Sequence, residues 1–423
     1  MPPNRLMPRA DTVVIGAGLA GLSCAAELAE RGASVFLAAK GMATTHWTHG
    51  ALDVAAPADA VTPRDGVRLL ARSGAHPYRL LGGDVDAAVS GHLSRTADRG
   101  LAHTGSLDAP LVDMPTAIGS LRRVAIVPAG QAAAVEPWRG DALVLVGFAR
   151  YRDAWASYAA RNLANAEWEG GPGGISAVEV ELPETDRLHN FNALTLSRLF
   201  DDPVWRAQAL AAVASALPSG SARLGLPAVL GLDRHAEVLA DAEQITGRRI
   251  FEVPSLPPSI PGLRLFEALH ARILGAGGRI QIGFDVVDIE REGSRVAAIH
   301  TEAASRTLRL AADSFVLATG GIAGAGIRAR PDGTLHERVF GLPVAAPPRE
   351  EWFSDDPLRP HPLEAAGIEV DAELRPAELE NVRVIGSALA GMHYLDQRCG
   401  DGVALASAHL AARSLAGTTA AAA

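Results

Sequence analysis

Apolar runs and a helical stretch alternate in the N-terminal part of the chain. Residues 12–15 and 34–38 are short apolar runs, and residues 22–31 between them form the helical stretch. This alternation predicts strand, helix, strand. The turn before the helix reads Gly16-Ala17-Gly18-Leu19-Ala20-Gly21. In this setting the glycine pattern predicts a Rossmann-like dinucleotide-binding fold, and therefore an α/β protein.

Each glycine of this turn has its own physical role. Gly16 permits the sharp turn out of the strand, and Gly18 lets the backbone approach a pyrophosphate because it has no Cβ. Gly21 lets the helix pack closely on the strand. The phosphates then lie at the helix N-terminus, where free N–H groups favour anions. We therefore expect a cofactor site formed by Gly16, Gly18, Leu19, Ala20 and Gly21.

The end of the second strand bears on which nucleotide is bound. NAD-binding proteins place an acidic residue there for the ribose hydroxyls. In this chain the position falls near Ala39 and Lys40, and no acidic residue occurs between Glu30 and Asp53. This counts against NAD. Lys40 could bind the extra phosphate of NADP, but a lysine at the end of a strand is as easily a solvent-exposed residue with no ligand.

A change in pattern after residue 81 indicates a second domain. Amphipathic helices are expected at residues 85–99 and 204–216, and strands at 142–148 and 177–182. The proline-rich segment 255–261 predicts a rigid, non-helical lead into a helix at residues 265–274.

The nucleotide domain resumes near residue 263. Residues 279–290 and 295–301 alternate like a hairpin around Gly293-Ser294. An apolar strand then ends in Ala318-Thr319-Gly320-Gly321, and a later one ends in Ile385-Gly386-Ser387. Gly400 and Gly402 precede a helix expected at 403–415, and the tail 417–423 is expected to be frayed. We therefore predict a dinucleotide-binding domain (1–81 and 263–423) interrupted by an inserted α+β substrate or cap domain (82–262).

Composition limits the possible partners. The chain has 423 residues and a formal net charge of −9, with no basic stripe that would suggest nucleic acid. It contains no apolar run long enough for a membrane span and no signal peptide, so we expect a cytoplasmic protein. Its two cysteines, Cys24 and Cys399, cannot ligate an iron–sulfur cluster, which normally takes four thiolates.

The motifs resemble a known family. The segment after the second strand (Lys40-Gly41, then Thr, His and Gly residues) is similar to flavoproteins of the fumarate reductase and succinate dehydrogenase group, which also lack the ribose acid and bind FAD. The whole chain resembles the B subunits of the anaerobic, quinone-linked glycerol-3-phosphate dehydrogenases. The matching segments are 11–22, His46 with 50–53, Ala75-His76-Pro77-Tyr78, 181–183, Leu256-Pro257-Pro258-Ser259 with Gly262 and Arg264-Leu265, 374–376, 385–387, and Gln397 with Cys399-Gly400 and Gly402-Val403. Asp401 stands where the family pattern leads us to expect glycine.

The resemblance implies an enzyme of three different subunits and a reaction. A catalytic flavoprotein subunit, this chain, and an iron–sulfur, membrane-anchoring subunit would oxidise sn-glycerol 3-phosphate to dihydroxyacetone phosphate and pass electrons to quinone. The complex would lie at the inner face of the cell membrane. FMN is sometimes given for the family, but a turn built for a pyrophosphate favours FAD. A non-catalytic electron-relay protein and a stand-alone fumarate reductase-like enzyme remain alternatives.

The resemblance also indicates roles for single residues. His46 or His49 would take the hydroxyl proton. Arg264, Arg375 and Arg398 are candidates for the substrate phosphate. The helix that starts near Gly402 would turn its positive end toward the flavin. The expected cofactor contacts beyond the first turn are Lys40, Thr319, Gly320, Gly321, Gly386, Ser387, Gly400, Gly402 and Val403.

Overall fold

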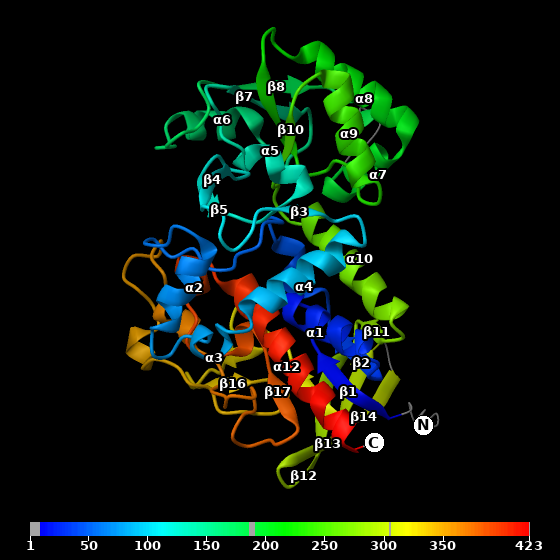
Figure 1. The fold of residues 1–423 in the computed structure, drawn as a ribbon, viewed down its shortest axis with the longest axis vertical. Coiled ribbons are helices and arrows are strands. Elements are labelled where there is room, and N and C mark those ends of the chain that lie inside the picture. The colour runs from blue at the N-terminus through cyan, green and yellow to red at the C-terminus, as the bar shows by residue number, and fades with distance from the viewer. Residues whose placement is uncertain (1–8, 186–190, 304–305, 423) are drawn as a thin grey trace. The chain divides into compact units, whose positions relative to one another are not determined.

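A computed structural model describes residues 9–185, 191–303 and 306–422, and it divides into two compact units (Figure 1). The first unit holds residues 1–44, 53–96 and 266–423, and the second holds 45–52 and 97–265. The division falls after residue 96 rather than at 81. The reason is that helix α4 (Val85–Ala97) is bound to the first unit, where Arg95 Nε donates to Glu30 Oε2 at 2.8 Å.

A mixed sheet forms the centre of the first unit. Its strand order is β11-β2-β1-β14-β13-β12, and β17 also pairs with β14. Strands β1 (Ala10–Ile15), β2 (Val35–Ala39), β11 (Arg279–Ile282) and β17 (Val382–Val384) run parallel to their partners. All residues of β2 and β17 are buried, as expected for parallel strands covered on both faces. The predicted strand-helix-strand start and the mixed α/β class are confirmed.

Two helices from opposite ends of the chain pack together beside this sheet (Figure 1). They are α1 (Leu19–Glu30) and α12 (Gly400–Ala422). The buried Glu27 of α1 pairs with His409 of α12, whose Nδ1 lies 2.9 Å from Glu27 Oε1. The helix continues to Ala422, so the expected frayed tail is helical over its described residues.

The expected hairpin is present. Strands β12 (Asp285–Glu292) and β13 (Arg295–Ala303) are antiparallel, and Gly293 takes a φ of 60° in the turn between them. Strand β14 (Arg306–Leu317) then runs antiparallel to β13 and parallel to β1, with Leu317 opposite Ile15. This register brings the glycines after β14 level with the turn after β1.

The second unit contains a parallel sheet of order β10-β9-β7-β8. The strands are β7 (Ala142–Phe148), β8 (Ile175–Val180), β9 (Ala222–Pro227) and β10 (Ile250–Val253). Helices α6 (Ala156–Ala164), α7 (Ala193–Asp201), α8 (Pro203–Ala216) and α9 (His235–Thr246) connect them. Two antiparallel pairs complete the unit: β3 (His103–Thr104) with β6 (Val127–Pro128), and β4 (Val112–Pro115) with β5 (Leu121–Val124).

Two helical segments contain or follow prolines, and the first of them differs from the sequence expectation. The helix α10 (Ile260–Gly275) begins before residue 265 and includes Pro261, because proline is tolerated in the first turn of a helix. The region 61–81 is split into α2 (Pro63–Ala71) and α3 (Tyr78–Leu81), with the segment before Pro77 outside both helices. The shorter elements are α5 (Ala132–Val135), α11 (Tyr394–Gln397), β15 (Ile327–Ala329), β16 (Leu335–Glu337), η1 (Ala43–Trp47), η2 (Ala129–Gln131), η4 (Arg349–Glu351), η5 (Pro362–Ala365) and η6 (Gly386–Ala388).

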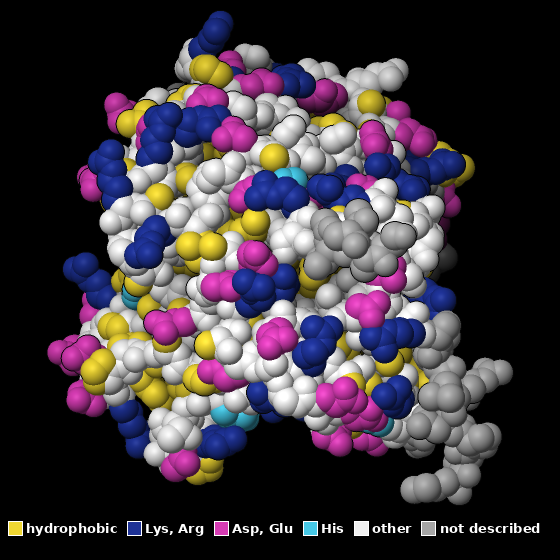
Figure 2. All heavy atoms as spheres, turned by 60° about the horizontal axis from the view of Figure 1, so that its bottom comes forward, with side chains coloured by type: hydrophobic (Ala, Val, Ile, Leu, Met, Phe, Trp, Pro, Cys, Tyr) yellow, Lys and Arg dark blue, Asp and Glu magenta, His cyan; other side chains and the backbone are white. Residues whose placement is uncertain are grey.

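The surface carries both signs of charge. Figure 2 shows Lys and Arg side chains intermixed with Asp and Glu over the face in view. Among the described residues, no helix combines the length and apolar character needed to cross a membrane.

Candidate flavin site

The turn between β1 and α1 forms a cradle for an anion. Gly16 has a φ of 115°, and a Cβ there would lie 2.3 Å from the Ala318 oxygen. A Cβ on Gly21 would lie 2.0 Å from the Gly16 oxygen, so the helix start fits closely against the strand end. At Gly18 the nearest atom to such a Cβ is the Ala43 Cβ at 3.6 Å, which leaves open space above this residue. The packing at these three positions agrees with the roles expected from the sequence.

The first turn of α1 is left available to a ligand. Gly18 is the N-cap and provides no side-chain hydrogen bond, and the first turn contains no acidic residue. The first N–H groups of a helix have no partner within the helix, and the helix dipole makes this end positive. The N–H groups of Leu19, Ala20 and Gly21 are therefore suited to a pyrophosphate, and a dinucleotide such as FAD fits here.

Two further glycine segments meet near this turn. Gly320 has a φ of 80° after β14, and Gly386 has a φ of 67° after β17. Gly386 lies close to α1, since a Cβ on it would be 2.8 Å from the Ala20 Cβ. The Gly321 N–H donates to Ser387 Oγ at 3.3 Å. The three motifs therefore converge at the carboxyl ends of β1, β14 and β17, where ligands of open α/β sheets bind.

Thr319 supplies a polar atom that the fold leaves unused. Its Oγ1 is buried and has no hydrogen-bond partner among the described residues. Buried hydroxyl groups are normally hydrogen-bonded, and an exception requires an explanation. A cofactor bound beside the glycine segments would provide that partner.

Lys40 lies beyond the end of β2, but it is already bound. Its Nζ is 2.9 Å from Asp285 Oδ2, and Arg338 Nη2 donates to Asp285 Oδ1 at 2.8 Å. Burial alone would raise the pKa of Asp285, but the hydrogen bonds from Lys40 and Arg338 outweigh it and lower the pKa. The sequence reasoning missed this acid because β12 brings it from a distant part of the chain, where Phe284 N–H donates to the Ala39 oxygen at 2.9 Å.

The first turn of α12 is held differently from the expectation. Asp401 and Gly402 donate their N–H groups to the Asp53 oxygen at 3.0 and 3.1 Å, and Asp401 Oδ2 accepts the Asp53 N–H at 2.9 Å. Val403 is fully buried. A Cβ on Gly402 would lie 2.1 Å from the Tyr78 hydroxyl, whereas Gly400 borders open space. Among these expected contacts, Gly400 has the room that a ligand needs, and Asp53 occupies the helix N–H groups.

The Ala-His-Pro-Tyr segment supports this helix start. His76 is buried, its Nδ1 accepts the Tyr78 N–H at 3.0 Å, and its Nε2 lies 3.5 Å from Cys399 Sγ. Burial lowers the pKa of His76 to about 4 and raises the pKa of the Cys399 thiol. The pair is therefore neutral, and Cys399 is a packed thiol rather than a reactive thiolate.

The structure joins the histidine loop to the proline-rich segment within the second unit. Ser259 donates its N–H to the His46 oxygen at 2.7 Å and its hydroxyl to the Thr48 oxygen at 2.6 Å. His49 Nδ1 accepts the Ala51 N–H at 3.2 Å, and Gln131 Nε2 donates to the His49 oxygen at 2.6 Å. Both histidine side chains are partly exposed.

Arg264 lies in an arrangement that the sequence did not suggest. It is 7% exposed, its Nη1 donates to Glu252 Oε2 at 2.7 Å, and its Nη2 donates to Glu252 Oε1 at 2.9 Å. Its Nε donates to the Gly231 oxygen at 2.9 Å. Burial alone would raise the pKa of Glu252, but the Arg264 charge outweighs it and lowers the pKa. Arg264, which was expected at the substrate phosphate, is therefore already bound to Glu252 inside the second unit.

Comparison with known proteins identifies the family. The family described as FAD binding domain matches residues 11–403. The chain is 32% identical to the B subunit of a probable anaerobic glycerol-3-phosphate dehydrogenase from Halobacterium salinarum, over 96% of this chain and 97% of that protein. It is also 32% identical to the B subunit of the anaerobic glycerol-3-phosphate dehydrogenase from Pectobacterium atrosepticum, over 96% of this chain and 99% of that one.

Solved structures show more distant similarity. A 3-ketosteroid delta1-dehydrogenase from Sterolibacterium denitrificans has a TM-score of 0.46 and 12% identity, covering 97% of this chain and all of that one. The quinol fumarate reductase of E. coli has a TM-score of 0.45 and 11% identity, covering 98% of this chain and 71% of that one. The family match confirms the prediction of FAD. The chain belongs to the FAD-binding domain family and, within it, to the family of anaerobic glycerol-3-phosphate dehydrogenase B subunits.

Proposed function

We propose that this chain is a flavoprotein component of a quinone-linked glycerol-3-phosphate dehydrogenase. The observation that carries the proposal is the end-to-end similarity to B subunits, which covers 96% of the chain. The complex would also contain a second, catalytic flavoprotein and an iron–sulfur protein, and the iron–sulfur protein would hold it at the inner face of the cell membrane. The substrate would be sn-glycerol 3-phosphate, and the product dihydroxyacetone phosphate.

In this proposal, different residues of the chain bind the cofactor and remove the substrate proton. Gly16–Gly21, Thr319 and the segments around Gly320 and Gly386 would hold FAD, which when bound accepts a hydride. His46 or His49 would take the hydroxyl proton, because each presents a partly exposed imidazole on a loop fixed by Ser259. Electrons would then leave for quinone through the iron–sulfur partner, since the two cysteines of this chain, Cys24 and Cys399, cannot supply the four thiolates that a cluster normally takes.

One observation favours a second candidate. Arg264, one of the three arginines expected at the substrate phosphate, is paired with Glu252. A chain without a free arginine at that position is suited to relaying electrons while the flavoprotein partner binds the substrate. In this alternative the chain carries FAD but takes no part in the oxidation of the alcohol.

A reduction assay separates the two candidates. Purified chain that releases FAD on denaturation is mixed anaerobically with glycerol 3-phosphate, and flavin absorbance is followed. Bleaching by the isolated chain supports catalysis here. Bleaching of this chain's flavin, beyond the loss that the partner's own flavin accounts for, only when the flavoprotein partner is present supports the relay. Quinone reduction should need all three proteins. Full turnover by the chain alone, or a colourless chain that binds NAD, would show the proposal to be wrong.

A further inference from the structure

The carboxyl end of β2 is reached by an acid from another strand. In dinucleotide-binding folds, an acidic residue at this strand end accepts the ribose hydroxyls of the nucleotide. Here β2 itself ends without an acid, and Ala39 is followed by Lys40. Gly283, with a φ of 89°, turns the chain from β11 into β12, and the Phe284 N–H then donates to the Ala39 oxygen at 2.9 Å. The next residue is Asp285, so a carboxylate lies beside the end of β2 after all.

Two cations hold this carboxylate in place and leave part of it open. Lys40 Nζ lies 2.9 Å from Asp285 Oδ2, and Arg338 Nη2 donates to Oδ1 at 2.8 Å and to Oδ2 at 3.0 Å. Burial alone would raise the pKa of Asp285, but these bonds outweigh it and lower the pKa, so the group is ionised at neutral pH. An ionised carboxylate has about four acceptor sites, and the described residues fill three of them. Because the side chain is 30% exposed, the remaining site is accessible to a ligand hydroxyl.

The same group of side chains is tied to the glycine segments of the cofactor site. The Arg338 N–H donates to the Gly326 oxygen at 3.0 Å, and the Gly326 N–H donates to the Gly321 oxygen at 3.1 Å. Strand β2 is the parallel neighbour of β1, so the carboxyl ends of both strands share one edge of the sheet. In folds of this kind, a nucleotide with its pyrophosphate at a turn such as Gly16–Gly21 has its ribose at the neighbouring strand end.

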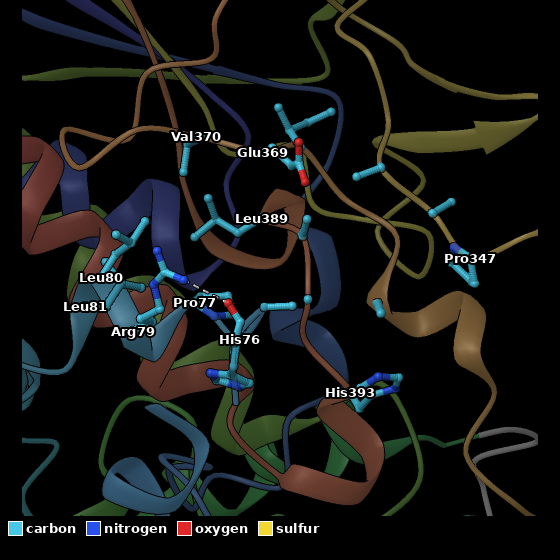
Figure 3. Close-up of a pocket in the computed structure, with 18 of the residues that line it drawn as sticks. His76, Pro77, Arg79, Leu80, Leu81, Pro347, Glu369, Val370, Leu389 and His393 are labelled. Carbon is cyan, nitrogen blue, oxygen red and sulfur yellow. Dashed lines mark hydrogen bonds between the residues drawn. The ribbon is translucent and has the colours of Figure 1, made fainter. Parts of the chain in front are cut away.

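The large cavity elsewhere in the first unit is less suited to this end of the cofactor. Its volume is about 640 Å³, and Figure 3 shows Leu80, Val370 and Leu389 around it. Among the described residues that line it, none belongs to the glycine segments, and the carboxylate on its wall is that of Glu369. The hydroxyls of a ribose would meet mostly apolar walls in this cavity, which disfavours them, whereas Asp285 offers an ionised acceptor.

We propose that Asp285 binds the ribose hydroxyls of the adenosine half of FAD. It thereby replaces, from β12, the acid that other dinucleotide-binding folds carry at the end of β2 itself. Lys40 and Arg338 are positioning residues, because they act through the carboxylate that they hold. The inference concerns the binding of the cofactor alone, and it applies to both candidate functions, since each requires FAD.

Titration of the flavin-free full chain with two flavins tests this role. The first is FAD, and the second is an FAD analogue whose adenosine lacks both the 2′- and the 3′-hydroxyl. Binding is followed by the change in flavin fluorescence, without substrate or partner proteins. The wild type should bind FAD about tenfold or more tightly than the analogue, which is the scale of hydrogen bonds to a charged group. In Asp285→Ala the ratio of the two Kd values should fall to about one.

Glu290→Ala is the matched control. Glu290 lies on the same strand and also has two partners, since Arg309 Nε donates to its Oε1 at 2.8 Å and His300 Nε2 lies 2.8 Å from the same oxygen. This variant should keep the wild-type ratio. Asp285→Asn retains the side-chain shape and one acceptor oxygen, so it should give an intermediate ratio, and it replaces Asp285→Ala if that variant does not fold. The ratio cancels effects that are common to both flavins, such as a change in stability or in net charge.

The outcomes separate this inference from the proposed function. Equal affinities of the wild type for the two flavins would overturn the inference, because the protein would then make no use of the hydroxyls. A wild-type ratio in both Asp285 variants would also overturn it and leave Asp285 as a link between β2 and β12. A wild type that binds neither flavin would overturn the inference together with the proposed function. The expected ratios, combined with no oxidation of glycerol 3-phosphate by the reconstituted complex, would support the inference and overturn the proposed function alone.

Discussion

At Gly18 the fold leaves room for a ligand. A valine there meets only ordinary contact with Ala43, so the apo fold should survive while the branched side chain occupies the space for the phosphates. We predict that Gly18→Val loses FAD, measured as flavin absorbance after denaturation, and keeps the far-ultraviolet circular dichroism of the wild type. Gly174→Val, another glycine with open space around it, should keep its flavin. Normal flavin in Gly18→Val would place the pyrophosphate elsewhere.

Arg264 shows the opposite situation, a charged group closed in by its own fold. Removing it leaves the Glu252 carboxylate buried without its cation, and we predict that Arg264→Ala lowers the free energy of unfolding by about 3–5 kcal/mol in urea titrations. Arg249→Ala, which removes an exposed guanidinium from Glu243, should cost less than about 1 kcal/mol. Wild-type stability together with a raised KM for glycerol 3-phosphate would restore Arg264 to the substrate site.

The Arg264–Glu252 pair should also depend on pH. The folded-state pKa of Glu252 is lowered, so the stability from the pair is present above the usual carboxylate pKa near 4.3 and is lost as the pH falls through the folded-state value. The difference in unfolding free energy between the wild type and Arg264→Ala should therefore shrink in acid. A difference that stays constant from neutral pH into acid would contradict this account.

At the scale of elements, the Ala-His-Pro-Tyr segment and α12 are coupled through a buried neutral histidine. As the pH falls from about 6.5 toward about 4, His76 becomes protonated in the unfolded chain but stays neutral in the folded protein. Protonation therefore favours the unfolded state over this range. The wild type should lose on the order of 3 kcal/mol of stability over this range from His76 alone. We predict that His76→Asn, which keeps an acceptor for the Tyr78 N–H, loses less between these two pH values. Equal losses in both proteins would show that His76 is charged in the fold.

The sequence predicted the elements that carry local signals. The turn at Gly16–Gly21, the hairpin around Gly293 and the glycines after β14 and β17 lie where their backbone requirements place them. Contacts between segments distant in the chain had no such signal. The Asp285 carboxylate at the end of β2, the Asp53 oxygen over α12 and the Glu252 partner of Arg264 all depend on tertiary packing. These contacts decide which charged groups remain available to a ligand. Sequence motifs alone therefore could not show which candidate residues are already bound within the fold.

At the scale of the whole molecule, we expect FAD to stabilise the first unit against thermal unfolding more than the second. Five of the six tryptophans, residues 47, 138, 155, 168 and 205, belong to the second unit, whereas the glycine motifs belong to the first. FAD at about 100 times its Kd should stabilise the unit that binds it by about 2.7 kcal/mol. We predict that excess FAD raises the temperature of flavin release more than the midpoint seen by tryptophan fluorescence. Coincident transitions that shift together would show a single cooperative unit.

The position of β1 between β2 and β14 has a consequence for biosynthesis. One edge of β1 pairs with β2 almost at once, but its other partner is complete only at Leu317, about 300 residues later. At roughly 5–20 residues per second, that edge waits about 15–60 s while the ribosome completes the intervening chain. The second unit, contiguous apart from residues 45–52, is synthesised in full during this interval. The nascent chain therefore exposes an apolar strand edge for most of its synthesis, and chaperone demand should be highest before β14 emerges.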